Sequence, residues 1–366
     1  MRVLVVNAGS SSLKLDLHDD EASVDSTTVE RWDASDLGPL RDFVERVGGA
    51  GSVDAVGHRV VHGGPEHARA ACVDDELLEY LDSIDDLAPL HNPPAVQAIR
   101  TVSRLLPQTP AVACFDTTFR ADLPPEARTY ALPREWNERW SLRRYGFHGL
   151  SHAYASRRAA ELVGRPLEDL RVVTCHLGSG ASLAAVRGGR SVDTTMGFTP
   201  LEGLVMRTRS GTVDPGLLVW LLQHGDVEVD ELARVLVRES GLKGLSGTSG
   251  DLRDVLEGRA DDADCRLAYE VFVHRLRREI GAMAASAGGL DVLVMTGGIG
   301  EHAVDVRSDV VDGLGWLGLE VDGDLNARAA GDTDVSTPSA PARTVVVTAS
   351  EETEIARQTA DLLRAP

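Results

Sequence analysis

The stretch Arg2-Val3-Leu4-Val5-Val6-Asn7-Ala8-Gly9-Ser10-Ser11-Ser12-Leu13-Lys14 decides the fold of this 366-residue chain. Residues 2–6 form a short apolar run that predicts a buried strand, and residues 13–17 alternate as a second strand does. The small residues between them let the backbone close around an anion, while hydroxyls, peptide N–H groups and Lys14 can meet phosphate oxygens. No Walker A pattern is present, and no helix follows the turn. The stretch therefore predicts a phosphate-binding turn between two strands.

The same pattern returns in the second half of the chain, at Val172-Val173-Thr174-Cys175-His176-Leu177-Gly178-Ser179-Gly180-Ala181-Ser182-Leu183. A third glycine-rich turn, residues 296–302, follows the apolar run 292–295, where an open α/β sheet binds its ligand. A single Gly/Ser turn after a strand is more often a plain hairpin turn than a phosphate site. This chain has three such turns, two of which are similar to each other, and this favours a nucleotide site. The repetition predicts two related domains that close on a nucleotide from opposite sides.

Composition narrows the class of partner. A net charge of −20 argues against nucleic acid or an anionic membrane surface as the ligand. Of 37 cationic side chains only Lys14 and Lys243 are lysines, so Lys14 in the first turn stands out, although a chance surface lysine is the alternative. The four cysteines show no paired spacing, and neither a signal pattern nor an apolar run of membrane-spanning length is seen. We expect a cytoplasmic protein without a membrane or nucleic-acid partner.

Strand-like runs alternate with helical patterns along the chain, which predicts an α/β fold. The clearest helix is 266–285, ended by Gly288-Gly289, and Ser151 is expected to cap another over 153–162. The Pro-containing segment 122–145 is expected to be irregular, with a domain boundary at its start.

Six of the eleven histidines fall in four short motifs, which are 58–64, 90–94, 146–152 and the second turn. The pairs His58/His62 and His148/His152 have the spacing of a zinc site on a helix, but one lies in a strand-like run and the other contains a glycine, so hydrogen-bonded turn histidines are the alternative. These histidines occur together with Arg59, Arg209 and Asp116, and the combination resembles a site for anions and a metal. Asp116 ends the strand-like run 112–115, where catalytic carboxylates of α/β sheets lie, although a helix-capping role is the alternative.

In order along essentially the whole chain, these motifs resemble those of the acetokinase family, a branch of the actin, Hsp70 and sugar-kinase superfamily. The segments that carry the resemblance are 7–14, 58–64, 115–117, 145–149, 196–214, 298–301 and 351–352. The resemblance implies a duplicated two-domain α/β fold of the actin-like ATPase (ribonuclease H-like) type. It implies an N-terminal domain of residues 1–118 plus 351–366 and a C-terminal nucleotide-binding domain of residues 119–350.

The resemblance also implies a reaction and its residues: reversible transfer of the γ-phosphoryl group of ATP to acetate, giving acetyl phosphate and ADP, with Mg²⁺ and in a homodimer. Asn7 and Glu351 would hold the metal, and the groups around the phosphoryl would be Asp116, His148 and Arg209. The acceptor would be bound by Arg59 and by an apolar pocket of Val61, Leu90, Phe147 and Pro200. The nucleotide would be lined by Ser10, Ser12, Lys14, His176, Leu177, Gly178, Ser179, Gly180, Asp251, Leu252, Arg253, Gly298, Ile299, Gly300, Glu301 and His302.

The chain departs from the family pattern at Ser179 in place of Asn, Arg207 in place of Gly and His302 in place of Asn, and its segment before Arg59 is short. Ser179 keeps a hydroxyl donor, whereas Arg207 adds bulk and charge near Arg209. Acetate is already ionised at neutral pH, which favours Asp116 as a metal-shell or orienting group over a general base. Propionate kinase is the alternative within the family. A nucleotide-switched actin-like or Hsp70-like module is the alternative of another class, and such a module needs no carboxylate pocket around Arg59.

Overall fold

The computed structural model describes residues 1–9, 12–33, 36–89 and 91–365. The chain divides into two compact units. The first unit consists of Met1–Ala121, Phe147–Tyr154 and Ser350–Pro366, and the second of Asp122–Gly146 and Ala155–Ala349. The domain bounds expected from the sequence, 1–118 plus 351–366 and 119–350, stay a prediction.

The first unit is built on a six-stranded mixed sheet in the order β3-β2-β1-β4-β6-β5. β1 pairs antiparallel with β2 and parallel with β4, so the predicted strand–turn–strand at the N-terminus is confirmed. The strands are β1 (Arg2–Ala8), β2 (Ser12–Asp19), β3 (Ala22–Glu30), β4 (Ala55–Val60), β5 (Ala71–Cys72) and β6 (Ala111–Phe115).

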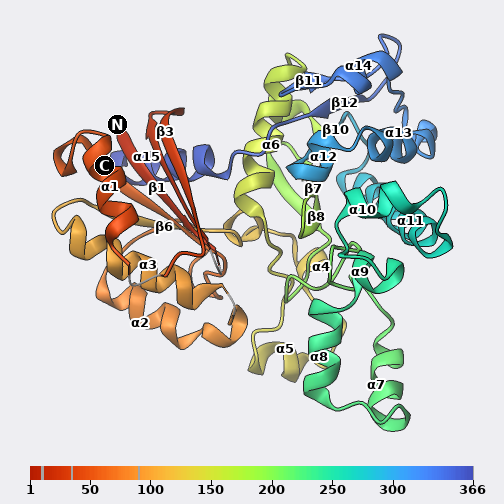
Figure 1. Cartoon of the computed structure of the whole chain (residues 1–366), viewed down its shortest axis with the longest axis horizontal. Helices are drawn as coiled ribbons and strands as arrows, with labels where there is room; N and C mark the ends of the chain where they lie inside the picture. The colour runs from red at the N-terminus through yellow and green to blue at the C-terminus, as the bar shows by residue number, and fades with distance from the viewer. Residues whose placement is uncertain (10–11, 34–35, 90, 366) are drawn as a thin grey trace. The chain divides into compact units, whose positions relative to one another are not determined.

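Helices cover both faces of this sheet, because side chains alternate between the two faces of each strand. Leu4 and Val6 of β1 pack toward α1 and α3, and the next residues, Val3 and Val5, pack against the C-terminal helix α15. Figure 1 shows α15, in blue, lying beside the red strands although it is the last element of the chain. The helices of this unit are α1 (Gly38–Arg46), α2 (Asp75–Ser83), α3 (Asn92–Leu105), the start of α6 (Gly149–Leu162) and α15 (Glu351–Arg364).

The second unit repeats this topology. Its sheet has the order β11-β12-β10-β7-β8-β9. When this order is read from the β9 edge and six is subtracted from each strand number, it is the order of the first sheet. The pairing directions agree as well, with β7 antiparallel to β8 and parallel to β10. The duplicated α/β fold of the actin-like type is therefore confirmed. The strands are β7 (Arg171–Leu177), β8 (Ala181–Arg187), β9 (Arg190–Thr194), β10 (Val292–Thr296), β11 (Thr333–Asp334) and β12 (Arg343–Val346).

Two helix predictions had different outcomes. The helix expected over 266–285 is α11, Ala263–Ala287, and it ends where Gly288 takes φ +77°, a backbone conformation that favours glycine. The helix expected from a Ser151 cap was placed too late, because α6 begins at Gly149 and Ser151 lies inside it. The other helices of the second unit are α4 (Pro125–Arg128), α5 (Arg134–Arg139), α7 (Pro215–His224), α8 (Val229–Arg238), α9 (Gly241–Ser246), α10 (Leu252–Gly258), α12 (Gly297–His302), α13 (Val304–Asp312) and α14 (Gly323–Arg328). Among the described residues, no helix combines the length and apolar character needed to cross a membrane.

Candidate active site

The first turn brings Asn7 and Lys14 together as cross-strand partners of β1 and β2. The turn is closed by the Gly9 amide, which donates to the Ser12 carbonyl at 2.8 Å. The predicted phosphate-contacting Ser10 lies outside the described residues.

The C-terminal helix supplies carboxylates to this turn because α15 lies very close to β4. A Cβ atom on Gly57 of β4 would come within 2.5 Å of Thr359 Oγ1 and 2.7 Å of Ile355 Cγ2, so only glycine permits this approach. The helix begins with Glu351 and Glu352, both in its first turn. Glu352 accepts from Asn7 Nδ2 at 3.2 Å and pairs with Lys14 Nζ at 3.0 Å.

Arg59, near the end of β4, is the centre of the charge cluster in the first unit. Its Nη2 donates to Asp116 Oδ2 at 2.6 Å and its Nε to Asp116 Oδ1 at 3.4 Å, while Nη1 donates to Asn7 Oδ1 at 3.3 Å. Nε also pairs with Glu351 Oε2 at 3.4 Å. Burial alone would lower the pKa of Arg59, but the charges of Asp116 and Glu351 raise it above its ordinary value, so the guanidinium stays charged.

Glu351 shares its cation, because Arg59, its only ion-pair partner within the described chain at 3.4 Å, also pairs with Asp116 at 2.6 Å. Burial raises the pKa of Glu351 to about 7; Arg59 opposes the shift, and the nearby Asp116 and Glu352 charges add to it. The cluster thus sets three carboxylates, Asp116, Glu351 and Glu352, against two cations, Arg59 and Lys14.

This donor set fits Mg²⁺. The ion prefers oxygen ligands and commonly takes one or two from the protein while phosphate and water supply the rest. Asn7 Oδ1 and the Glu351 carboxylate both lie within 3.4 Å of the same guanidinium, and the cluster carries one more carboxylate than cations. The two predicted metal ligands are thus gathered around one side chain.

Asp116 and His148 are joined through the backbone of the first unit. Asp116 follows β6 and is buried, and its carbonyl accepts from the Gly149 amide at 2.9 Å. A Cβ on Gly149 would lie 2.1 Å from that carbonyl oxygen, which explains the glycine after His148. His148 itself has φ +56°, a left-handed conformation that is uncommon outside glycine and is concentrated at functional sites.

The predicted apolar pocket is only partly described. Val61 is half-buried, Phe147 is buried, and the Phe147 ring packs edge-on against the His62 ring at 5.6 Å between centroids. Leu90 lies outside the described residues. Pro200 belongs to the second unit, where its carbonyl accepts from Arg209 Nη1 at 3.2 Å.

His58 and His62 are buried side chains of the first unit. His62 Nδ1 accepts from the Gly64 amide at 2.8 Å, and the Asn92 amide side chain bonds both to the backbone N–H and to the carbonyl of His62. Burial lowers the pKa of His58 to about 3 and of His62 to about 4, so both rings are neutral at neutral pH. Over the described ranges, no group of three or more His, Cys, Asp or Glu side chains is arranged to hold a metal ion.

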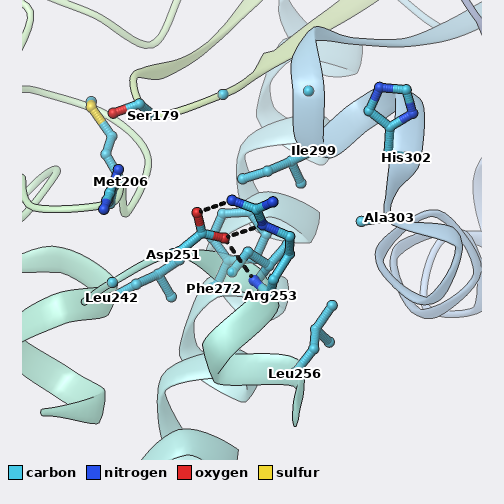
Figure 2. Close-up of a pocket in the computed structure, with 15 residues that line it drawn as sticks. Ser179, Met206, Leu242, Asp251, Arg253, Leu256, Phe272, Ile299, His302 and Ala303 are labelled. Carbon is cyan, nitrogen blue, oxygen red and sulfur yellow. Dashed lines mark hydrogen bonds and ion pairs between the residues drawn. The ribbon is translucent and has the colours of Figure 1, made fainter. Parts of the chain in front are cut away.

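The second unit contains a cavity of about 470 Å³ at the second Gly/Ser turn (Figure 2). One end is formed by Gly178 and Ser179, and the predicted turn at Gly298 forms another wall as the first residues of α12. The predicted nucleotide residues that line it are Gly178, Ser179, Asp251, Leu252, Arg253, Gly298, Ile299 and His302.

Asp251 and Arg253 form a fixed pair in the wall of this cavity, as the dashed lines in Figure 2 show. Asp251 caps α10 by accepting from the Arg253 amide at 3.0 Å, and its carboxylate also accepts from Arg253 Nε at 3.0 Å and Nη2 at 2.8 Å. These hydrogen bonds hold the pKa of Asp251 well below its ordinary value. The pair therefore presents a carboxylate acceptor at a stable position.

Five predicted nucleotide residues of the second unit, His176, Leu177, Gly180, Gly300 and Glu301, are not part of the cavity wall, and neither are Ser12 and Lys14 of the first unit. Glu301 has another contact, because its Oε1 accepts from the Ala349 amide at 3.0 Å. Sequence reasoning missed several wall residues. These are Met206, Arg207, Leu242, Gly250, Leu256, Phe272 and Ala303. Three of them, Leu242, Leu256 and Phe272, are apolar residues of α9, α10 and α11, and an apolar residue in a cavity wall has the same sequence pattern as one in a hydrophobic core.

Arg207 belongs to this wall and is exposed. Its amide donates to the Ser179 carbonyl at 3.3 Å and its Nε to the Ser249 carbonyl at 3.4 Å. Two of the departures from the family pattern, Ser179 and Arg207, are thus direct neighbours. Arg209, two residues on, is half-buried, and burial lowers its pKa.

A family model described as the acetokinase family matches residues 44–357. The chain is 46% identical over 405 aligned residues to the acetate kinase of Synechococcus sp. (strain JA-2-3B'a(2-13)), with 100% of both chains covered. Among solved structures it is similar to Porphyromonas gingivalis acetate kinase (32% identity, TM-score 0.91, 99% of this chain and 100% of the other). It is equally similar to a propionate kinase from Francisella tularensis subsp. tularensis SCHU S4 (33% identity, TM-score 0.90, 98% and 99% covered). On this evidence, the chain belongs to the acetokinase family.

Proposed function

We propose that this protein is an acetate kinase, which transfers the γ-phosphoryl group of ATP reversibly to acetate and so interconverts ATP plus acetate with ADP plus acetyl phosphate. The observation that carries the proposal is the 46% identity to an acetate kinase over the full length of both chains. The cavity at the second Gly/Ser turn supports the nucleotide part of the reaction. The Arg59 cluster supports an anionic acceptor and a divalent cation.

Arg59 keeps donors for a carboxylate although it already holds Asp116. A guanidinium has five N–H groups, two on each terminal nitrogen. Each terminal nitrogen of Arg59 has one protein partner in the described structure, Asn7 for Nη1 and Asp116 for Nη2. One N–H on each therefore remains for the two oxygens of acetate, in the bidentate manner that suits arginine.

The chemistry requires positioning and charge neutralisation, since acetate is ionised at neutral pH and offers no proton to a base. Arg209 and His148 stabilise the equatorial oxygens of the transferring group as charge spreads over them. Asp116, held by Arg59, orients the guanidinium. Asn7 and Glu351 would hold Mg²⁺, which would neutralise charge on the phosphate oxygens.

The test is the steady-state rate of acetyl phosphate formation from MgATP with acetate, propionate, butyrate or no acceptor. We expect the highest specificity constant with acetate and no acyl phosphate without an acceptor. The Arg209→Ala variant, purified in the same way, controls for contaminating kinases. Rapid ATP hydrolysis that is indifferent to every acceptor would contradict the proposal and favour a nucleotide-switched module.

Propionate kinase is the second candidate, supported by the Francisella structure of equal similarity. Val61 offers a way to separate the two, because a β-branched side chain is stiff and cannot move aside for a longer acyl chain. We expect Val61→Ala to shift the ratio of specificity constants toward propionate by about 1–3 kcal/mol. If both constants fall equally, the acyl pocket lies elsewhere.

We further propose a cytoplasmic homodimer. The cysteines are free thiols, which is typical of a protein in a reducing compartment.

The surface that supports the dimer is α7. None of its residues is buried, and it exposes Leu217, Val219, Trp220 and Leu222, with Trp220 54% exposed. An apolar helix without a charged side chain is unusual on the surface of a monomer, and a second copy of the same helix is a partner of matching character. A mass in solution of one chain would contradict the dimer.

A further inference from the structure

We propose that Glu352 is a positioning residue that binds the side chains of both Asn7 and Lys14. By holding the Asn7 NH₂ group, it orients the Asn7 side-chain carbonyl toward the metal. The inference rests on the proposed function, since it concerns the use of Mg²⁺ by this chain. Glu352 is not among the residues that the sequence predicts for the site. It is only 5% exposed and lies in the first turn of α15.

The orientation of the Asn7 amide is decided by chemistry on both sides. A carboxylate only accepts hydrogen bonds, so Glu352 Oε1, at 3.2 Å, requires the NH₂ group of Asn7. A guanidinium only donates, so Arg59 Nη1, at 3.3 Å, requires the Asn7 oxygen. The oxygen, the only atom of this amide that can bind Mg²⁺, therefore faces the Arg59 and Glu351 side of the cluster.

The second oxygen of Glu352 holds Lys14. Lys14 Nζ lies 3.0 Å from Glu352 Oε2, and Lys14 is the cross-strand partner of Asn7. One carboxylate thus bridges a metal ligand on β1 and the only cation of the predicted phosphate turn on β2. With both oxygens engaged, Glu352 is less suited than Glu351 to be a metal ligand, because Glu351 has Arg59 as its single ion-pair partner in the described chain.

A second glutamate of the same helix provides a matched control. Glu354 is fully buried, and its carboxylate accepts from Arg357 Nη2 at 2.8 Å and from Gln358 Nε2 at 2.7 Å, both on α15 itself. Loss of either glutamate charge changes the first turn of α15, but only Glu352 contacts Asn7 and Lys14.

The experiment compares Glu352→Gln with Glu354→Gln by two measurements: the Mg²⁺ concentration for half-maximal acetyl phosphate formation, and the binding of Mn²⁺ in the presence of ADP, followed by electron paramagnetic resonance. Glutamine keeps the size of the side chain but turns an NH₂ group toward either Lys14 or Asn7. We expect both metal constants to weaken about tenfold to a hundredfold in Glu352→Gln, which is typical when the partner of a ligand is lost. They should be unchanged in Glu354→Gln.

A double-mutant cycle with Asn7→Ala distinguishes positioning from general destabilisation. If Glu352 acts through Asn7, its loss in the Asn7→Ala background adds little to the metal constants. Additive effects, or equal metal constants in Glu352→Gln and wild type, would overturn the inference. Should Glu352→Gln fail to fold, Glu352→Asp carries the same cycle. A wild-type protein that neither forms acetyl phosphate nor binds the Mn²⁺–ADP pair would instead contradict the proposed function.

Discussion

Arg59 combines a structural role with a proposed binding role, and its sequence motif does not show that both belong to one side chain. It neutralises Asp116 and Glu351 in the fold, and under the proposal it binds the acceptor carboxylate. Arg209, by contrast, donates to a backbone carbonyl and has no carboxylate partner in the described residues. Loss of the two arginines should therefore differ in stability as well as in kinetics.

We expect Arg59→Ala to raise the Michaelis constant for acetate and to lower the free energy of unfolding by about 3–5 kcal/mol, because it leaves buried carboxylates uncompensated. Arg209→Ala should reduce the turnover number by roughly two to four orders of magnitude with little effect on stability, if its contact strengthens in the transition state. Denaturant melts and acetate titrations of both variants test this. Similar stability losses in the two variants would contradict the role of Arg59 in the cluster.

The raised pKa of Glu351 predicts a pH effect on the metal-free protein. The group titrates near 7 when folded but near 4.5 when unfolded, so its contribution to stability is complete below pH 4.5 and is lost as pH rises toward 7. We expect Glu351→Gln, which cannot ionise, to reduce the fall in Tm between pH 5 and pH 8, measured in EDTA. Glu135→Gln, at an exposed position of α5, is the control. An unchanged pH profile in Glu351→Gln would contradict the buried environment.

Residue types could be predicted at these positions, but not all of their partners. The motif around residues 351–352 pointed to Glu351, yet nothing in the sequence indicated that Glu352 bridges Asn7 and Lys14, because that contact joins segments about 340 residues apart. The apolar wall of the cavity, including Leu256 and Phe272, was missed since it reads as ordinary core.

At the scale of elements, close approach at glycine sets the site. Gly57 lets α15 settle on β4, and Gly149 lets α6 start against the Asp116 carbonyl. The strand–turn–strand patterns were predictable because alternation and turn residues are local signals. The start of α6 was not, because it depends on the left-handed backbone of His148 and on the contact of Gly149 with a distant carbonyl.

We expect Gly57→Ala to push α15 away from β4. The added methyl would overlap Thr359 and Ile355, which should cost about 1–3 kcal/mol of stability. Since Glu351 and Glu352 begin this helix, the Mg²⁺ requirement should rise as well. Gly323→Ala is the matched control, because a Cβ there meets no atom within 4 Å. Equal melting temperatures and Mg²⁺ constants in the two variants would show that α15 can shift freely.

At the scale of the whole molecule, the chain uses one α/β topology twice, and each copy carries its own set of proposed ligand residues. The first unit carries the carboxylates and Arg59, and the second carries the cavity with Asp251 and the loop with Arg209. The chain carries a net charge of −20, so anionic ligands must be attracted by local cations such as Arg59 and Arg209.

The most direct test of the central claim is whether this protein equilibrates ATP plus acetate with ADP plus acetyl phosphate. Phosphorus NMR would follow ATP, ADP and acetyl phosphate in the presence of Mg²⁺, starting once from ATP and acetate and once from ADP and acetyl phosphate. We expect both mixtures to converge on the same ratio of products to reactants, and we expect Arg209→Ala to slow both approaches equally. Loss of ATP to inorganic phosphate, with no acetyl phosphate formed and none consumed, would contradict it.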